Sequence, residues 1–132
     1  MIIDRQIIKE VLISFGLPRA IIDEMDNYPA ISMHIQDTPD VFISCHDDKL
    51  WMWSLLPFGL NKIDSPGALR IIDILSSTLN GADGAGVFML QTDNGLELKA
   101  SMTATNFNSS ESVKLTIEGF IRKLQGIISE VN

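Results

Sequence analysis

The chain has 132 residues, of which 45% are hydrophobic and 20% charged, and its 17 acidic residues outnumber its 10 basic residues for a net charge of −7. This size and composition predict one globular domain, residues 1–132, with a hydrophobic core of its own. The negative charge argues against nucleic acid and anionic membrane surfaces as partners, and the longest apolar run, near residues 50–60, is too short for membrane insertion.

The N-terminal half predicts two helical segments followed by three strands. A helix is expected from about Asp4 to Phe15, because apolar residues at helical spacing form one face and Gly16 and Pro18 follow. Pro18 then opens a short helical turn. The three strands, recognised by alternation or by dense apolar content between short polar turns, are expected at residues 30–36, 41–45 and 49–56. They should form an antiparallel meander.

The C-terminal half predicts a helix, a hairpin of two strands and a long helix. These elements are expected at residues 64–81, 86–92, 96–104 and 109–131. Asp64 or Ser65 should cap the first of these helices and Gly81 should end it, while Asn108 with Glu111 should cap the last. The order α-β-β-β-α-β-β-α predicts an α+β fold, with a five-stranded antiparallel sheet and three main helices.

The second and third of the main helices differ in how much of their surface is apolar. In the last helix the apolar side chains fall within about 120°. In the helix from residue 64 to 81, Leu69 and Ile74 widen the apolar arc to roughly 220°. We expect this helix to pack on its own sheet and also on a second subunit, as in a two-fold homodimer. The alternative is that two aliphatic side chains are simply exposed.

The chain's two tryptophans, Trp51 and Trp53, stand two residues apart in the third expected strand and should share one face. A tight turn at residues 46–49 would pair Cys45 with Leu50 and would divide the hairpin into two faces: Val41, Ile43, Cys45, Leu50 and Met52 on one, and Phe42, Trp51, Trp53 and Leu55 on the other. The strand should be central and covered on both sides. We expect the tryptophans to lie under or beside the second main helix, near the dimer interface, and not to stack on a ligand. If the turn between the two strands had an odd number of residues, the two groups would exchange faces and this placement would fail.

Two motifs that suggest chemistry have an unsuitable context. Residues 45–48, with sequence CHDD, contain three kinds of metal ligand, but adjacent strand residues point to opposite faces and the only other histidine is His34. The run GADGAG at residues 81–86 follows a helix and precedes a strand, the reverse of a dinucleotide-binding loop, and predicts a helix end and a flexible connection. We therefore expect no catalytic residue, no metal and no cofactor.

The single cysteine, Cys45, fits a reducing compartment. The first residues carry charges at Asp4, Arg5, Lys9 and Glu10, which is unlike the apolar core of a signal peptide. We expect a cytoplasmic protein.

Three features together resemble the class I type III secretion chaperones, in particular the class IB group typified by InvB and SpaK. The first is the order of elements in a chain of this size with a pI of about 4.6. The second is the stretch GLPRAIIDEMDNYPAISMHI, in which a small helix leads into the first strand. The third is DDKLWMWSLL, which is similar to the third strand of that family with its tryptophan-bearing centre. The resemblance spans essentially the whole chain.

The resemblance implies a bacterial, cytoplasmic homodimer that binds the N-terminal segments of one or more secreted effectors. Such a protein keeps the segment extended and helps to deliver it to the secretion apparatus, and it catalyses no reaction. We expect the dimer interface to include Leu69, Ile72, Ile74, Leu75 and Trp53. We expect the effector to contact Ile7, Val11, Ile31, Met33, Ile35 and Phe42, although for most of these a plain core role is the favoured alternative.

Two other functions stay open on the sequence alone. One is a small ligand-binding protein or enzyme that uses the Trp51 and Trp53 face as a pocket. The other is a structural subunit that dimerises without a client.

Overall fold

The computed structural model describes residues 5–24, 27, 30–46, 48–84, 86–103 and 109–131. The elements run in the order α1 (Arg5–Ser14), α2 (Arg19–Asp23), β1 (Ile31–Ile35), β2 (Thr38–His46), β3 (Lys49–Leu55), the short 3₁₀ helix η2 (Leu60–Lys62), α3 (Ser65–Ser76), β4 (Phe88–Thr92), β5 (Gly95–Thr103) and α4 (Ser110–Ser129). The main elements therefore follow the predicted order, and the α+β class is confirmed.

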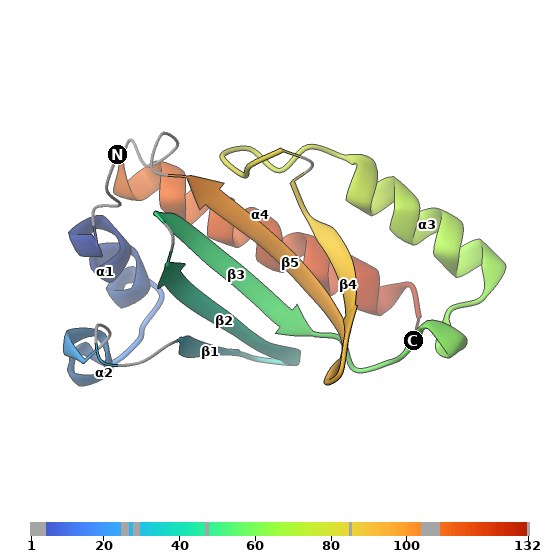
Figure 1. Cartoon of the computed structure of the whole chain (residues 1–132), viewed down its shortest axis with the longest axis horizontal. Helices are drawn as coiled ribbons and strands as arrows, with labels where there is room; N and C mark the ends of the chain where they lie inside the picture. The colour runs from blue at the N-terminus through green and yellow to red at the C-terminus, as the bar shows by residue number, and fades with distance from the viewer. Residues whose placement is uncertain are drawn as a thin grey trace.

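The five strands form one antiparallel sheet in the order β1-β2-β3-β5-β4 (Figure 1). β1 and β4 are consequently the two edge strands. In the β2–β3 hairpin, Cys45 lies opposite Leu50 and Ile43 opposite Met52, which is the predicted register. The even-length turn therefore keeps the expected grouping of residues by face.

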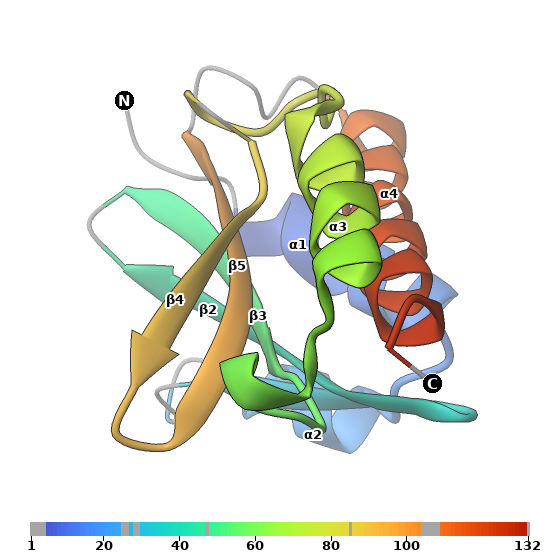
Figure 2. The same cartoon turned by 90° about the vertical axis from the view of Figure 1, so that its right-hand side faces the viewer.

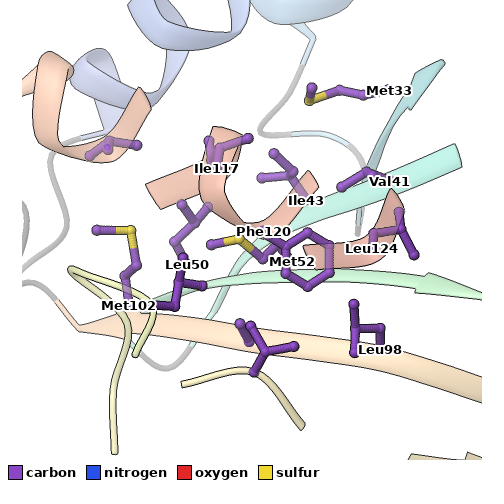
Figure 3. Packing of buried hydrophobic residues seen from close by; sticks show 14 of the residues in the cluster. Met33, Val41, Ile43, Leu50, Met52, Leu98, Met102, Ile117, Phe120 and Leu124 are labelled. Carbon is purple, nitrogen blue, oxygen red and sulfur yellow. The ribbon is translucent and has the colours of Figure 1, made fainter. Parts of the chain in front are cut away.

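The helices α1, α3 and α4 all lie on one side of the sheet (Figure 2). The core between them consists of strand residues that face α4 and of the buried stripe of that helix. Figure 3 shows this packing, in which Met52 and Leu98 lie close to Phe120 and Leu124. All four of these side chains have no exposed surface. Because the single buried stripe of α4 meets one face of the sheet, the domain is a two-layer structure.

The helix α3 begins as predicted and ends earlier than predicted. The Asp64 carboxylate caps it by accepting a bond from the Gly67 N–H at 2.6 Å. The helix stops at Ser76 instead of Gly81, because Ser77 is extended, with φ −77° and ψ 143°. The ammonium group of Lys123 on α4 donates to the carbonyl groups of Ile74 and Ser77 at 2.8 and 3.0 Å, and the Ser77 hydroxyl also donates to that of Ile74 at 2.8 Å, which satisfies this helix end.

The cap of α4 also differs from the prediction. Ser109 is the N-cap, and its hydroxyl accepts a bond from the Ser112 N–H at 3.2 Å. The Ser112 hydroxyl accepts in return from the Ser109 N–H at 3.4 Å, so two serines form a capping box. The predicted partner Asn108 lies outside the described residues, and Glu111 is instead an acidic residue of the first turn.

The connection between α3 and β4 is attached to the sheet, in contrast to the flexible segment that we expected. The Asp83 carboxylate accepts bonds from the Thr103 N–H and the Ser101 hydroxyl, both at 2.9 Å, and lies 3.6 Å from the Lys49 ammonium. Gly81 has a φ of +87°, and a Cβ there would lie 2.3 Å from the Thr116 hydroxyl oxygen. This glycine therefore permits both the turn and the close approach to α4.

Candidate binding surfaces

The sheet face opposite the helices carries both tryptophans, and we call it the tryptophan face. Residues directly opposite one another across a ladder point to the same side. The register places Phe42, Trp53, Lys99 and Phe88 in one continuous row across β2, β3, β5 and β4. The neighbouring rows complete the tryptophan face with Ser44, Trp51 and Ser101 on one side and with Leu55, Glu97 and Leu90 on the other.

The predicted position of this face was wrong. We expected the tryptophans to lie under or beside α3 and to be covered, but α3 packs on α4, on the other side of the sheet (Figure 2). The Ile74 side chain lies close to Gly126 of α4: a Cβ added at Gly126 would be 3.4 Å from Cδ1 of Ile74. The wide apolar arc of α3 is therefore partly covered by α4. β3 is central in the sheet, but helices cover only one of its faces.

Aromatic rings and lysines are stacked on the tryptophan face. The Phe42 and Trp53 rings stack with centroids 5.6 Å apart, and the His46 and Trp51 rings stack at 5.8 Å. The Lys99 ammonium lies 4.9 Å from the Trp51 ring centroid and 5.8 Å from that of Trp53. The Trp51 indole N–H is shielded from solvent and has no acceptor among the described residues.

Both edges of the sheet lack the usual protection against pairing with another strand. Natural edges are commonly blocked by lysine, by proline or by other charged side chains. β1 has the sequence ISMHI and β4 has the sequence FMLQT, so neither contains a lysine, an acidic residue or a proline. Each strand is hydrogen-bonded to one neighbour in the sheet. Both edges are therefore available to a further strand.

Large apolar side chains are exposed on both sides of the sheet. Phe88 and Leu90 of β4 are 38% and 42% exposed on the tryptophan face, and Leu69 and Ile72 of α3 are 69% and 56% exposed. The helix α3 lies on the opposite side of the sheet from the tryptophan face (Figure 2). We call Leu69 and Ile72 the α3 surface. Isolated exposed aliphatic residues are ordinary, but two large ones that are neighbours on one helix face indicate an interaction site.

The β1 edge borders a surface hollow of about 450 Å³, lined by Ala20, Ile21, Glu24, Ala30, Ile31 and Ser32. Ile21 of α2 is 47% exposed beside this hollow. At the same edge the Asp40 carboxylate accepts hydrogen bonds from the His34 ring at 3.0 Å and from the Ser32 hydroxyl at 3.1 Å. These two bonds, that of His34 foremost, hold the pKa of Asp40 below its ordinary value.

The structure separates the residues that we expected to contact an effector. Val11, Ile31 and Met33 are buried in the core, with at most 4% of their surface exposed, whereas Ile7 and Ile35 are partly exposed against it. Phe42 lies on the tryptophan face. The five residues of α1 and β1 therefore lie at one end of the domain, whereas Phe42 lies on the other face of the sheet.

The expected dimer residues are separated as well. Leu69 and Ile72 are exposed side by side on α3, but Ile74 and Leu75 are partly buried against their own chain. Trp53 lies on the opposite side of the sheet from α3. Sequence reasoning missed Lys99, Phe88 and Leu90. The sequence feature that could have identified them is the alternation of side chains along β5 and β4. It places them in rows with the tryptophans only once the strand order is known.

The described residues contain no group of three His, Cys, Asp or Glu side chains arranged to hold a metal ion. Asp47 of the CHDD motif lies outside them. In the same part of the chain, no helix has the length and apolar character needed to cross a bilayer.

Comparison with solved structures shows the same fold in other proteins, among them the following two. The chain superposes with a TM-score of 0.64 on a chain of the heterodimeric ExoU–SpcU complex from the type III secretion system of Pseudomonas aeruginosa, at 15% identity, covering 95% of this chain and 98% of that one. It superposes with a TM-score of 0.58 on YbjN from E. coli, described as a putative transcription regulator, at 15% identity and with 96% and 90% coverage. At such identities the likeness establishes the fold alone, and one fold serves several functions.

Sequence comparison is more specific. Curated protein sequences contain no match to this chain. The sequence profile of the Invasion protein B family matches residues 16–84, which is more than half of the chain and includes the stretches from α2 to β3 on which the resemblance rested. The chain therefore belongs to the Invasion protein B family, a family of type III secretion chaperones.

Proposed function

We propose that this protein is a cytoplasmic homodimeric chaperone that binds the N-terminal segments of one or more secreted effectors and keeps them extended for the secretion apparatus. The observation that carries the proposal is that a member of this chaperone family leaves both edges of its sheet open and apolar. The match to a chain from a heterodimeric complex of a type III secretion system supports a protein partner. The function is binding alone, without a catalysed reaction.

The α3 surface is the proposed dimer interface. A two-fold axis brings the same patch of both subunits together, so an exposed apolar surface covers itself. Leu69 and Ile72 keep the role that we expected for them, because both are exposed on α3. Ile74 and Leu75 support this surface from beneath, and Trp53 is no longer part of it.

The β1 edge is the proposed site for an extended part of the effector. An unfolded segment has unpaired backbone groups that an open edge can bind, and its alternate side chains need apolar recesses. The hollow beside Ile21 and Ile31 offers such a recess next to the edge. Ile7 and Ile35 add partly exposed apolar surface at the same end of the domain, while Val11 and Met33 form its buried floor.

Isothermal titration calorimetry tests effector binding. The purified protein is titrated with N-terminal segments of type III effectors from the source bacterium, produced as separate polypeptides. We expect saturable binding of at least one segment, with the masses of both chains unchanged afterwards. The absence of binding by every segment would contradict the proposed function.

Sedimentation equilibrium tests the dimer. The double variant Leu69→Glu/Ile72→Glu places two carboxylates on the α3 surface and should sediment as a monomer. Leu115→Glu is the matched control, since Leu115 on α4 is 55% exposed outside this surface. A double variant that remains dimeric with the mass of the wild type would refute this interface.

A further inference from the structure

The tryptophan face has a chemical character that the proposed dimer and strand-pairing sites do not use. It is an open, largely apolar sheet surface whose large side chains are aromatic and hence rigid. Phe88 and Leu55 are 38% and 40% exposed on it. Aromatic side chains that stay accessible in this way are the residues that most often dominate protein interfaces.

The charge at the centre of this face is unbalanced. Lys99 stands in the row between Trp53 and Phe88, and its ammonium group lies over two indole rings. Among the residues that the structure describes, no carboxylate lies within 4.0 Å of this ammonium group. The nearby Lys49 differs, because it pairs with Asp83.

The acidic groups on and around the same face are already engaged. The Asp40 carboxylate accepts bonds from His34 and Ser32, and that of Asp83 accepts bonds from Ser101 and Thr103. Glu97 lies one row away from Lys99, and its carboxylate accepts a hydrogen bond from the Thr92 hydroxyl at 3.3 Å. In a chain with 17 acidic residues, the centre of the tryptophan face thus presents a cation without an acidic partner. A segment that covers this face gains by supplying the carboxylate itself.

The dimensions of the row indicate the form of that segment. Phe42, Trp53, Lys99 and Phe88 occupy four neighbouring strands, so the row extends over three strand spacings, about 14 Å in total. A helix of about ten residues has nearly this length, and its turns repeat every 5.4 Å or so, close to the spacing of about 4.8 Å between strands. Apolar side chains one turn apart can therefore lie between successive residues of the row.

We infer that the tryptophan face binds an amphipathic helical segment of the effector, which lies across the strands and places a carboxylate against Lys99. This inference rests on the proposed function and adds a second site to it. The extended part of the effector pairs with the β1 edge, and a helical part covers Phe42, Trp53 and Phe88. The role of Lys99 is to select acidic amphipathic segments over other apolar ones.

A single-stranded nucleic acid is the competing occupant, because aromatic side chains interleaved with lysine also stack on bases. A strand of nucleic acid needs several cations along its backbone, and the chain has a net charge of −7. The other lysine of this face, Lys49, lies 5.6 Å from the Trp51 ring centroid but pairs with Asp83. One carboxylate requires only one cation, which Lys99 supplies. The observations therefore favour the peptide.

Calorimetry with two variants tests the inference. The probes are the effector segment that binds the wild-type protein and a synthetic amphipathic peptide of about 15 residues, roughly four helical turns, with leucine and glutamate on one face. Trp53→Ala should weaken both interactions on the order of 10- to 30-fold, and Lys99→Gln about five- to tenfold. A twin peptide with glutamine in place of glutamate should bind Lys99→Gln and the wild type equally.

Lys62→Gln and Leu60→Ala are the matched controls, because both residues lie in η2 outside the tryptophan face and Leu60 is 59% exposed. Circular dichroism verifies that each variant is folded, and Lys99→Gln provides the result if Trp53→Ala does not fold.

Effector binding that is unchanged in both variants would overturn this inference and leave the proposed function intact. If no effector segment binds the wild type, the proposed function fails, and the synthetic peptide still tests the face. An oligonucleotide that binds more tightly than the peptide, and less tightly to Lys99→Gln, would overturn the choice of occupant.

Discussion

The two faces of the sheet alternate along the same strands but have opposite characters. On the helix-covered face Val41, Ile43, Leu50 and Met52 have no exposed surface at all. On the tryptophan face the larger aromatic side chains of the same two strands remain partly exposed, although aromatic residues usually contribute most to a core. Among the described residues, the buried hydrophobic core thus consists of aliphatic side chains, methionines and Phe120 of α4, while the tryptophans remain partly exposed.

Two lysines sharpen the contrast between the faces. Lys123, on the helix side, donates to the carbonyl groups that end α3 and so serves the fold. Lys99, on the other side, lies over the two indoles and has no carboxylate partner in the described part of the chain. The difference teaches that a lysine on the helix-covered face serves the packing of the domain, whereas the lysine at the centre of the tryptophan face has its charge exposed to a partner.

The largest expected effect compares one aromatic residue from each side. Phe120→Ala removes a fully buried ring of α4 and should lower the free energy of unfolding by about 3–5 kcal/mol. Trp53→Ala should lower it by only about 1 kcal/mol, the order of one aromatic pair, since Trp53 stacks on Phe42 at the surface. Urea denaturation at one fixed protein concentration measures both, because dimerisation makes stability depend on concentration. Equal losses would contradict the assignment of the faces.

A smaller effect is expected at the border between the faces. Asp83→Ala deprives the Thr103 N–H and the Ser101 hydroxyl of their acceptor and should cost about 1–3 kcal/mol. Asp83→Asn retains an acceptor but loses the charge opposite Lys49, so its cost should be smaller. Hydrogen exchange of the Thr103 amide, measured by NMR, should be faster in Asp83→Ala. An unchanged exchange rate would show that the Asp83 carboxylate does not protect the Thr103 amide.

The two lysines should differ less strongly. Lys123→Met removes the ammonium donor from the Ser77 carbonyl and leaves the Ile74 carbonyl with the Ser77 hydroxyl as its remaining side-chain donor, and should cost about 1 kcal/mol. Lys99→Met should change the free energy of unfolding by less than about 0.5 kcal/mol, as is usual for surface substitutions. The same urea titrations measure both variants. A greater loss at Lys99 than at Lys123 would mean that the tryptophan face also carries the fold.

The smallest effect concerns the β1 edge of the tryptophan face. His34→Ala removes the main cause of the lowered pKa of Asp40, so that pKa should rise toward 3.8, and Ser32→Ala should raise it less. Because the pKa is depressed in the folded state, Asp40 contributes stability above pH 3.8 and loses it as the pH falls through the folded-state pKa. An NMR titration of the Asp40 carboxyl carbon measures the shift, and an identical titration curve in His34→Ala would refute the stated cause.

Much of the fold follows from local patterns that the sequence displays. Alternation and an even-length turn give the β2–β3 register, and the Asp64 cap gives the start of α3. Other features depend on contacts that are distant in the sequence. The end of α3 depends on Lys123, which lies 49 residues from Ile74. Alternation assigns residues to a common face without indicating which face the helices occupy, and for that reason the tryptophans were placed on the wrong side.

The candidate site was less predictable than the fold for the same reason. Leu69 is recognisable from α3 alone, because it lies outside the apolar stripe of that helix. Lys99 and Phe88 come to lie beside Trp53 only through the strand order, in which β5 separates β3 from β4. An apolar residue such as Val11 or Met33 has the same local pattern whether it ends in the core or at the surface.

The most direct test of the tryptophan face uses the two tryptophans as reporters, since both lie on that face and the chain has no others. The measurement is acrylamide quenching of tryptophan fluorescence, with and without a saturating effector segment that contains no tryptophan. If the effector covers this face, the emission should shift to shorter wavelength and the quenching constant should fall. Saturable binding with an unchanged emission and an unchanged quenching constant would contradict the account.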